Sequence, residues 1–329
     1  MKLFQIYVEQ AVVEHPMVQA ILSRYPNVPV VIIEAYQEIF NRHKQHFRVQ
    51  KETPCLILAK KYGKYLHPIP KKFGLGFDEH YYFSTVLNCP FDCQYCFLQG
   101  QNKSAHYVVF VNHEDFKSAL ESLIRSKPQA RFGFFSGYDG DSLALNSLSR
   151  FCESFLPFFT QFDNAVCEYR TKSTAIHPLI HHVPDKSALV AYSLNPQAVI
   201  DSYEPNTPPL DHRLKALRKL LDHGYQIGLR FDPLLLVDEF KKTYETFFEQ
   251  VFKALDPSTI HSVTLGTFRM PKPVYHQFLK LGACLQQTAL LDPVEDTYGY
   301  PLETQEKMIA FCREKLLSYI PPEHLFLMH

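Results

Sequence analysis

The chain lacks tryptophan, an excess of charge of either sign and any long apolar run. Its 329 residues include 27 Phe and 19 Tyr but no Trp, so we expect a core rich in phenyl rings. Lys and Arg together number 34, as do Asp and Glu. This balance gives no overall attraction to nucleic acid or to an anionic membrane. No apolar stretch approaches the roughly 18 residues of a membrane-spanning helix, so no membrane contact is expected.

The amino-terminal residues and the cysteines both bear on the cellular compartment. Residues 1–13 show neither the apolar core of a signal peptide nor an Arg-rich transit composition, which favours a cytoplasmic location. Eight cysteines in a long chain, three of them in one short segment, favour metal ligands and free thiols over a disulfide framework. The five cysteines outside that segment are expected to be small core residues: Cys55, Cys152, Cys167, Cys284 and Cys312.

The three clustered cysteines, Cys89, Cys93 and Cys96, have the spacing C-x3-C-x2-C. Thiolates this close in sequence can face one point, and such soft ligands select zinc, copper(I) or iron–sulfur clusters. The spacing differs from the paired C-x2-C knuckles of zinc sites, and no fourth Cys or His follows at zinc-finger distance. Three thiolates leave one iron of a cubane cluster open to a small molecule. The alternative is a non-catalytic binding protein in which zinc takes a distant fourth ligand such as a His.

A strand-then-helix rhythm begins near residue 81. Strands alternating with helices predict an α/β fold with a parallel sheet in right-handed βα units, either open or closed into a partial barrel. The expected strands are 83–87, 131–135, 166–171, 188–194, 226–231 and 262–268. The expected helices lie near 114–126, 142–157, 174–182, 211–223, 241–255 and 273–283.

The segment before this rhythm, residues 1–80, is expected to form a small α/β region. Its predicted elements are a strand at 3–8, helices at 16–25 and 30–40, a strand at 55–59 and a loop at 60–77. Lys60, Lys61 and Lys64, followed by Lys71 and Lys72, make this loop the best candidate for a local basic patch. Residues 81–270 then form the barrel, and 271–329 a helical extension that closes it.

Polar residues stand at the carboxyl ends of the predicted strands, where a parallel sheet or barrel places its site. A turn flanked by glycines follows the second strand, and the third ends near a Lys that could reach a carboxylate ligand. The fourth strand ends with a hydroxyl and an amide suited to a ribose or an amino group. Glu204 and Arg213, in a Pro-rich loop, are expected to form an ion pair. The candidate residues at these ends are Tyr138, Asp139, Asp141, Ser142, Lys172, Ser193, Asn195, Arg230, Asp232 and Arg269.

Over nearly its whole length the chain resembles the spore photoproduct lyase family of the radical S-adenosylmethionine (SAM) superfamily. The resemblance rests on Tyr7-Val-Glu9, the Cys-Gln-Tyr-Cys-Phe-Leu-Gln segment, Arg170-Thr-Lys172, Ser193-Leu-Asn195, residues 204–213, 223–229 and 268–273. It implies a partial (β/α)6 barrel of the TIM type for residues 81–270.

The same resemblance implies the cofactors and the residues that hold them. Cys89, Cys93 and Cys96 would bind a [4Fe–4S] cluster, and its open iron would bind SAM. The reduced cluster would cleave SAM to methionine and a 5′-deoxyadenosyl radical. The protein would position the cofactors and keep water out of the site. A flavodoxin or ferredoxin type of reductant is the expected partner. The residues expected near SAM are Tyr95, which should pack on it, Lys172 and Ser193, with Asp141, Ser142, Asn195 and Arg230 as further candidates.

Three departures from the lyase concern the substrate. The hydrogen-donating Cys of the lyase is matched here by Ser136 or Gly137, and the Tyr after its third cluster cysteine is matched by Phe97. Its basic carboxyl-terminal segment is matched by residues 291–300, with three acids and no Lys or Arg, a poor partner for phosphates. We therefore expect a lyase-like radical SAM enzyme whose substrate the sequence does not identify. If this enzyme needs a protein hydrogen donor, Tyr138 and Cys284 are the candidates. The alternative is a DNA-lesion (thymine dimer) lyase with a different hydrogen donor.

Overall fold

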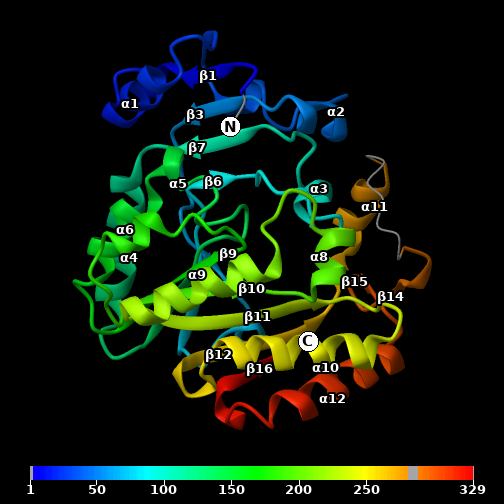
Figure 1. Cartoon of the computed structure of the whole chain (residues 1–329). Coiled ribbons are helices and arrows are strands. Elements are labelled where there is room, and N and C mark those ends of the chain that lie inside the picture. The colour runs from blue at the N-terminus through cyan, green and yellow to red at the C-terminus, as the bar shows by residue number, and fades with distance from the viewer. Residues whose placement is uncertain (1–2, 281–287, 329) are drawn as a thin grey trace.

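The computed structural model describes residues 3–280 and 288–328, in which two large sheets are built from interleaved parts of the chain (Figure 1). The amino-terminal sheet has the order β2-β1-β3-β7-β6. Its strands are β1 (Ile6–Glu9), β2 (Val30–Ile33), β3 (Leu56–Ala59), β6 (Val86–Leu87) and β7 (Tyr107–Phe110). All neighbours are parallel except β6 and β7. The cysteines lie between these last two strands, so the amino-terminal sheet holds both ends of their loop.

The prediction of a helix at residues 30–40 is wrong. Val30 to Ile33 form β2, which pairs in parallel with β1 from Ile6↔Val30 to Glu9↔Ile33. Four β-branched residues in a row favour a strand because their side chains are stiff at χ1. Only a short 3-10 turn, Tyr36–Glu38, follows. The other expectations for this region are close to what is observed, since α1 spans Pro16–Arg24 and β3 lies within 55–59.

The second sheet is parallel except at one edge and has the order β16-β12-β11-β10-β9-β8-β5-β4. Its strands are β4 (His67–Pro68), β5 (Glu79–Tyr82), β8 (Phe132–Phe135), β9 (Ala165–Thr171), β10 (Ala188–Ser193), β11 (Gln226–Leu234), β12 (Ile260–Thr267) and β16 (Leu325–Leu327). Only the pair β4–β5 is antiparallel. The α/β class and a parallel, half-barrel sheet are confirmed. An exact count of six βα units is not, because β16 adds a parallel strand beyond β12.

The first barrel strand was expected at 83–87, which is wrong. The strand in the barrel is β5, which pairs with β8 from Glu79↔Phe132 to Tyr82↔Phe135. After Phe83 the chain leaves this sheet, and β6 joins β7 in the other one. Residues 79–87 therefore serve two sheets, and sequence periodicity does not show where this stretch divides.

Helices cover the outside of the half-barrel and connect its strands (Figure 1). They are α4 (His113–Ser126), α5 (Asn146–Ser149), α6 (Phe151–Phe159), α7 (His177–Ile180), α8 (Gln197–Tyr203), α9 (Leu210–His223), α10 (Phe240–Ala254) and α12 (Leu302–Leu316). Helix α11 (Lys272–Lys280) instead packs against the short helix α3 (Leu98–Gln101), which follows the cysteines. The single helix expected at 142–157 is instead divided, because Arg150 between α5 and α6 adopts a left-handed conformation (φ 51°). In the described part of the chain, no helix is both long and apolar enough to span a bilayer.

The core is rich in phenyl rings, as the composition predicts. Phe83 lies against Phe151 and Phe155, with ring centroids 5.8 and 5.2 Å apart.

At the carboxyl-terminal side, β13 (Arg269–Pro271), β14 (Asp292–Val294) and β15 (Thr297–Gly299) form a small antiparallel sheet. The extension after residue 270 is thus only partly helical. The division of the chain at residues 80 and 270 stays a prediction.

Candidate active site

The cysteine loop is fixed by backbone hydrogen bonds. Cys96 N donates to Cys93 O (3.0 Å), and the short helix α3 (Leu98–Gln101) begins directly afterwards. Within the loop, Gln99 Nε2 donates to Cys93 O (2.6 Å). Gln94 N donates to Tyr203 O (2.8 Å), which joins the loop to the end of α8. The loop therefore lies between the amino-terminal sheet and the carboxyl ends of the barrel strands.

The three thiols lie in one electrostatic environment. Burial raises the pKa of each, that of Cys93 to about 12, and the other two thiols raise the pKa of Cys89 further. The charge of Lys172 lowers the pKa of Cys93, because Lys172 Nζ lies 3.7 Å from the Cys93 sulfur. Across residues 3–280 and 288–328, no three His, Cys, Asp or Glu side chains are gathered as ligands of a single metal ion.

Glu204 is the centre of a buried network beside this loop. Its carboxylate accepts hydrogen bonds from Tyr95 OH, Asn195 Nδ2 (2.9 Å) and Arg213 Nη2 (2.5 Å), and Lys172 Nζ lies 3.9 Å away. Burial alone would raise the pKa of Glu204, but the charges of Lys172 and Arg213 and these hydrogen bonds outweigh it and lower the pKa to about 2. The expected Glu204–Arg213 ion pair is confirmed.

Four of the residues expected near SAM meet at this network. Lys172 Nζ lies over the Tyr95 ring, 5.0 Å from its centroid. Asn195 is buried, and its Oδ1 has no hydrogen-bond partner within the described residues. Ser193 is half-buried at the end of β10, and its carbonyl accepts from Arg213 Nη1 (3.0 Å).

These residues fit the two cofactors that the resemblance implies. Three soft thiol ligands on one loop suit an iron–sulfur cluster. A buried amide oxygen without a partner is costly unless a ligand donates to it, and Asn195 Oδ1 is such an acceptor. The Lys172 ammonium beside Cys93 supplies a positive charge for a carboxylate. The donor set therefore matches both a cluster and an amino-acid-bearing cofactor.

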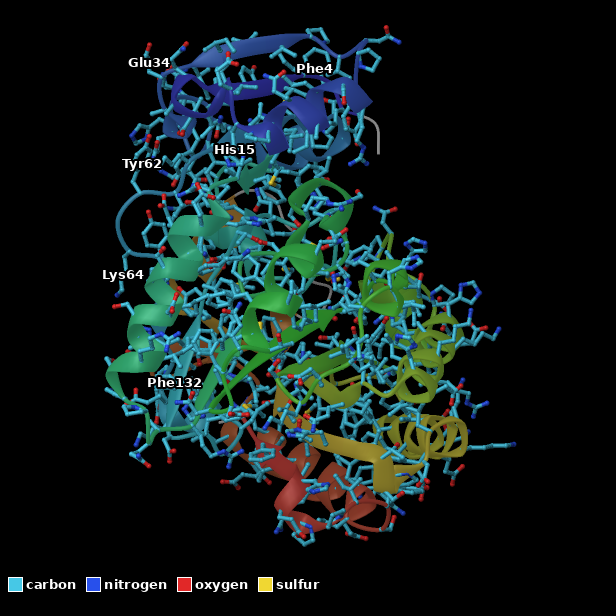
Figure 2. The ribbon with its side chains drawn as sticks, turned by 90° about the vertical axis from the view of Figure 1, so that its left-hand side faces the viewer. Phe4, His15, Glu34, Tyr62, Lys64 and Phe132 are labelled. Atoms are coloured by element: carbon cyan, nitrogen blue, oxygen red, sulfur yellow. The ribbon has the colours of Figure 1, made fainter. Side chains whose placement is uncertain are left out.

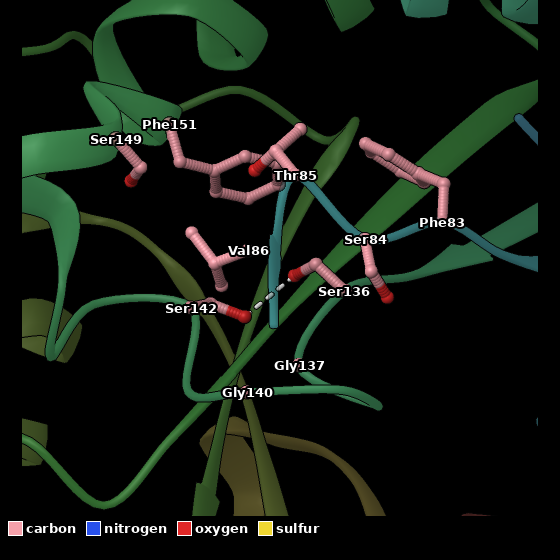
Figure 3. A pocket seen from close by; sticks show the side chains of 10 residues that line it. All are labelled: Phe83, Ser84, Thr85, Val86, Ser136, Gly137, Gly140, Ser142, Ser149 and Phe151. Atoms are coloured by element: carbon pink, nitrogen blue, oxygen red, sulfur yellow. Dashed lines mark hydrogen bonds between the residues drawn. The ribbon is translucent and has the colours of Figure 1, made fainter. Parts of the chain in front are cut away.

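Asp141 and Ser142 connect the loop after β8 to the end of β9. Asp141 Oδ1 accepts from Ala144 N (2.8 Å) and Thr171 Oγ1 (2.6 Å), and its Oδ2 from Lys172 N (2.8 Å). Asp141 thus caps the turn before α5 and places the backbone of Lys172. Ser142 Oγ lies 2.6 Å from Ser136 Oγ, as the dashed line in Figure 3 shows. The two hydroxyls face each other in a small pocket that also contains Ser84 and Thr85.

Gly137, between Ser136 and Tyr138, has a backbone conformation that favours glycine. Its φ is +86°, and a Cβ there would lie 3.1 Å from both Arg170 O and Ser142 Oγ. Any other side chain would therefore be strained here, by the positive φ and by these two close contacts. The turn therefore directs Tyr138 away from the Ser136–Ser142 pair and toward the mouth of the barrel.

Arg230 belongs to a second buried network, inside the barrel. Its Nη2 donates to Glu168 Oε2 (2.7 Å), and its Nη1 to Ser262 O (3.2 Å). Arg170 Nε donates to the other carboxylate oxygen of Glu168 (2.8 Å). The charges of Arg230 and Arg170 overcome the effect of burial and lower the pKa of Glu168 to about 2. The guanidinium of Arg230 is fully buried and faces the barrel interior, away from the cysteine loop.

Tyr138 lies above this second network with two other aromatic rings. It stacks on Tyr82 (centroids 4.7 Å apart), which in turn stacks on His67 (4.9 Å). Burial raises the pKa of Tyr138, and in the described part of the chain its hydroxyl has no hydrogen-bond partner. Arg269, near the same mouth, pairs with Asp232 through two contacts of 3.2 Å. Cys284, the other expected hydrogen donor, lies outside the described residues.

Sequence reasoning missed two residues that support the cysteine loop. Both come from α2 (Phe47–Glu52) in the amino-terminal region. Arg48 makes two 2.8 Å hydrogen bonds to the Asp92 carboxylate, and Lys51 Nζ donates to Cys89 O (2.5 Å) and Phe91 O (2.8 Å). The only sequence signal was the high density of basic residues before position 52, and nothing local connects that segment to the cysteines.

A family model described as spore photoproduct lyase matches residues 4–281 of the chain. Spore photoproduct lyase of Bacillus subtilis (strain 168) is 23% identical over 282 residues, which cover 84% of this chain and 78% of the relative. Its counterpart in Geobacillus sp. (strain Y412MC61) is 22% identical over 281 residues, 84% of this chain and 79% of that protein.

Two solved structures are similar over almost the entire chain. Spore photoproduct lyase complexed with dinucleoside spore photoproduct superimposes with a TM-score of 0.83 at 17% identity and covers 99% of this chain and 98% of its own. A double variant of the lyase with bound AdoMet and dinucleoside spore photoproduct gives 0.81 at 18% identity, with the same coverage. At these identities the likeness establishes the fold. The family model spans most of the sequence, and the chain therefore belongs to the spore photoproduct lyase family, whose members are radical SAM lyases.

Proposed function

We propose that the chain binds a [4Fe–4S] cluster through Cys89, Cys93 and Cys96 and uses it to cleave SAM, acting on a photoproduct lesion of the kind its relatives bind. The observation that carries this proposal is the joining of the cysteine loop to a strand-end network through Lys172, which lies 3.7 Å from Cys93 Sγ and 3.9 Å from the Glu204 carboxylate. When bound, the cluster would supply one electron to the sulfonium of SAM and release a 5′-deoxyadenosyl radical.

The residues around the loop have separate roles in this proposal. Lys172 binds the carboxylate of SAM, and Glu204 keeps Lys172 charged and in place through their 3.9 Å contact. Asn195 Oδ1 accepts a hydrogen bond from a donor of the cofactor, and Glu204 fixes its amide group (2.9 Å). Tyr95, whose hydroxyl is held by Glu204, presents an aromatic face beside the same space.

Substrate recognition is assigned to the mouth of the barrel. The stack of His67, Tyr82 and Tyr138 offers aromatic surface on which a pyrimidine can stack, which is worth about 1–3 kcal/mol per base. Arg170 is partly exposed there, and its two terminal nitrogens have no partner among the described residues, so they are available to a phosphate. The relative in complex with dinucleoside spore photoproduct supports a lesion of this class.

Lys61 and Lys64 supply positive charge close to this mouth. Burial lowers the pKa of His67, and the charges of Lys64 and Lys61 near the aromatic stack lower it further. Figure 2 shows Tyr62 and Lys64 on the outer edge of the molecule. The small sheet with β14 and β15 instead carries Asp292, Glu295 and Asp296. Contact with a polynucleotide would therefore occur on the basic loop and avoid the acidic hairpin.

The cofactor proposal is tested on protein purified without oxygen. We expect about four irons per chain and an electron paramagnetic resonance signal that shifts when SAM is added. Replacing Cys89, Cys93 or Cys96 by Ala should abolish iron retention. The matched control is Cys312→Ala, because Cys312 lies on α12, buried in the core. Full iron content in all three single variants, or stoichiometric zinc in the parent chain, would show the proposal to be wrong.

Tyr138 is proposed as the group that returns hydrogen to the product radical, since its hydroxyl, near the barrel mouth, has no hydrogen-bond partner among residues 3–280 and 288–328. The O–H bond breaks, the hydrogen atom joins the carbon radical of the substrate, and a tyrosyl radical remains. Tyr138→Phe should leave SAM cleavage intact while product formation from dinucleoside spore photoproduct falls at least tenfold. Unchanged product yield would remove this role from Tyr138. Tyr82→Phe, one ring away in the stack, is the control.

A further inference from the structure

The segment 41–52 is strongly basic and lies against the cysteine loop. It contains Arg42, Lys44, Arg48 and Lys51 but only one acid, Glu52. Arg42 and Lys44 are exposed, whereas Arg48 and Lys51 are half-buried. We call residues 42–51 the basic segment. A cluster of positive charge without neutralising acids on the same segment creates a local potential that the neutral overall charge of the chain conceals.

The basic segment is fixed to the structure that surrounds the cysteines. Asn41 Oδ1 accepts from Lys103 N (2.8 Å), and Gln50 Oε1 accepts from Ala105 N (3.0 Å), both just after α3. Phe47 packs on Ala105 in a small buried cluster. In Figure 1, α2 lies at the edge of the amino-terminal sheet, near α3 and well away from α9 and α10.

Lys51 and Arg48 link this surface directly to the loop. Lys51 Nζ donates to the carbonyls of Cys89 (2.5 Å) and Phe91 (2.8 Å). The Lys51 side chain alone therefore connects the basic segment to the backbone of a cysteine. Arg48 binds Asp92 and also donates to Gln99 Oε1 (2.9 Å), whose amide nitrogen holds Cys93 O. The basic segment is thus a surface from which an electron has a short path to the cysteines.

We infer that the basic segment is the docking surface for an acidic electron-donor protein of the flavodoxin or ferredoxin type. The inference rests on the proposed cluster. Such donors carry a strongly negative surface around their redox centre, which complements the exposed cations Arg42 and Lys44 and steers the encounter. In the transfer, the donor is oxidised by one electron and the cluster is reduced by one. The contacts favour a redox protein over DNA, because they lead to the cysteine loop and not to the aromatic stack.

The experiment measures cluster reduction in the reconstituted full-length protein by two reductants. One is a bacterial flavodoxin kept reduced by light, and the other is dithionite, a small molecule that needs no docking surface. We expect Arg42→Glu with Lys44→Glu to slow reduction by flavodoxin about tenfold at low ionic strength and to leave reduction by dithionite unchanged. The difference from the parent chain should shrink as salt is added.

The matched control reverses two exposed charges elsewhere, Lys219→Glu with Lys253→Glu on α9 and α10, and should change neither rate. If the parent chain holds no cluster that dithionite reduces, the proposed function fails. If dithionite reduces it but the Arg42/Lys44 variant accepts electrons from flavodoxin at the parent rate, only the docking inference is wrong. Loss of DNA binding in that variant, with unchanged reduction by flavodoxin, would also overturn the inference and reassign the surface to nucleic acid.

Discussion

The molecule contains two buried glutamates with similar electrostatics and different surroundings. Glu168 pairs with Arg230 inside the barrel, and Glu204 pairs with Arg213 beside the cysteine loop. The pKa of each is lowered to about 2 by cations that overcome burial. The two networks differ in their remaining partners. Glu204 also holds Tyr95 and Asn195, whereas Glu168 also holds Arg170.

The Glu204 network therefore supports the proposed cofactor site, whereas the Glu168 network supports the barrel. The partners of Glu204 face the loop that carries the cysteines, so a change at Glu204 reaches the cofactor side of the site. The network of Glu168 spans four neighbouring barrel strands, because Glu168 is on β9, Arg230 is on β11 beyond β10, and Ser262, which binds Arg230, is on β12. Equal perturbations of the two carboxylates should therefore have similar effects on folding and different effects on chemistry.

The largest loss of stability is expected from Glu168→Gln. Removing this charge leaves Arg230 buried without a counter-ion and releases Arg170, which should lower the free energy of unfolding by about 3–5 kcal/mol. Urea unfolding followed by circular dichroism measures the change. Glu121→Gln, on the exposed face of α4, is the control and should stay within about 0.5 kcal/mol of the parent. A loss under 1 kcal/mol at Glu168 would mean that the interior pair is not a structural support.

A comparable or somewhat smaller loss of stability, about 2–4 kcal/mol, is expected from Glu204→Gln. The amide still accepts hydrogen bonds from Tyr95 and Asn195, but it no longer balances Arg213 and Lys172. The distinguishing result is spectroscopic. The cluster signal should lose its response to SAM in Glu204→Gln and keep it in the folded fraction of Glu168→Gln. An identical response in both variants would remove the functional contrast between the networks.

A smaller effect concerns pH. Because both glutamates have a folded-state pKa near 2, below the ordinary value of 4.5, each contributes stability that is present above about pH 4.5 and is lost as the pH falls toward 2. Each contribution is about 3 kcal/mol. Between pH 5 and 2 the free energy of unfolding should therefore fall less steeply in each Gln variant than in the parent chain. Equal slopes would show that these carboxylates titrate normally.

The grouping of the candidate site residues was easier to predict from the sequence than the pairing of the strands. Cys89, Cys93 and Cys96 are adjacent in sequence, and strand-end residues such as Lys172 and Asn195 follow from parallel topology, so both could be read from the chain. The division of residues 79–87 between two sheets could not be read, because an alternating run shows that a strand exists and not which neighbour it pairs with.

The separation of Arg230 from the other candidates also escaped prediction. Arg230 and Ser193 stand opposite each other in neighbouring strands, which the sequence suggested. The Arg230 side chain folds back over Gly228, two residues earlier on β11, where a Cβ would lie 2.5 Å from Arg230 Nη2. It reaches Glu168, which is 62 residues away in the sequence, and no local pattern shows that contact. Lys51 was missed for a similar reason, because its partners are 38 and 40 residues away.

The pairing of β6 with β7 has a consequence for how the enzyme matures. Val86↔Val109 and Leu87↔Val108 clamp the two ends of the cysteine loop side by side, and β7 is in turn held by β3. The amino-terminal sheet thus closes the loop, which would reduce the entropy that binding of the proposed cluster must overcome. By linkage, insertion of that cluster would stabilise the sheet, so iron delivery and completion of the amino-terminal region would become one assembly step.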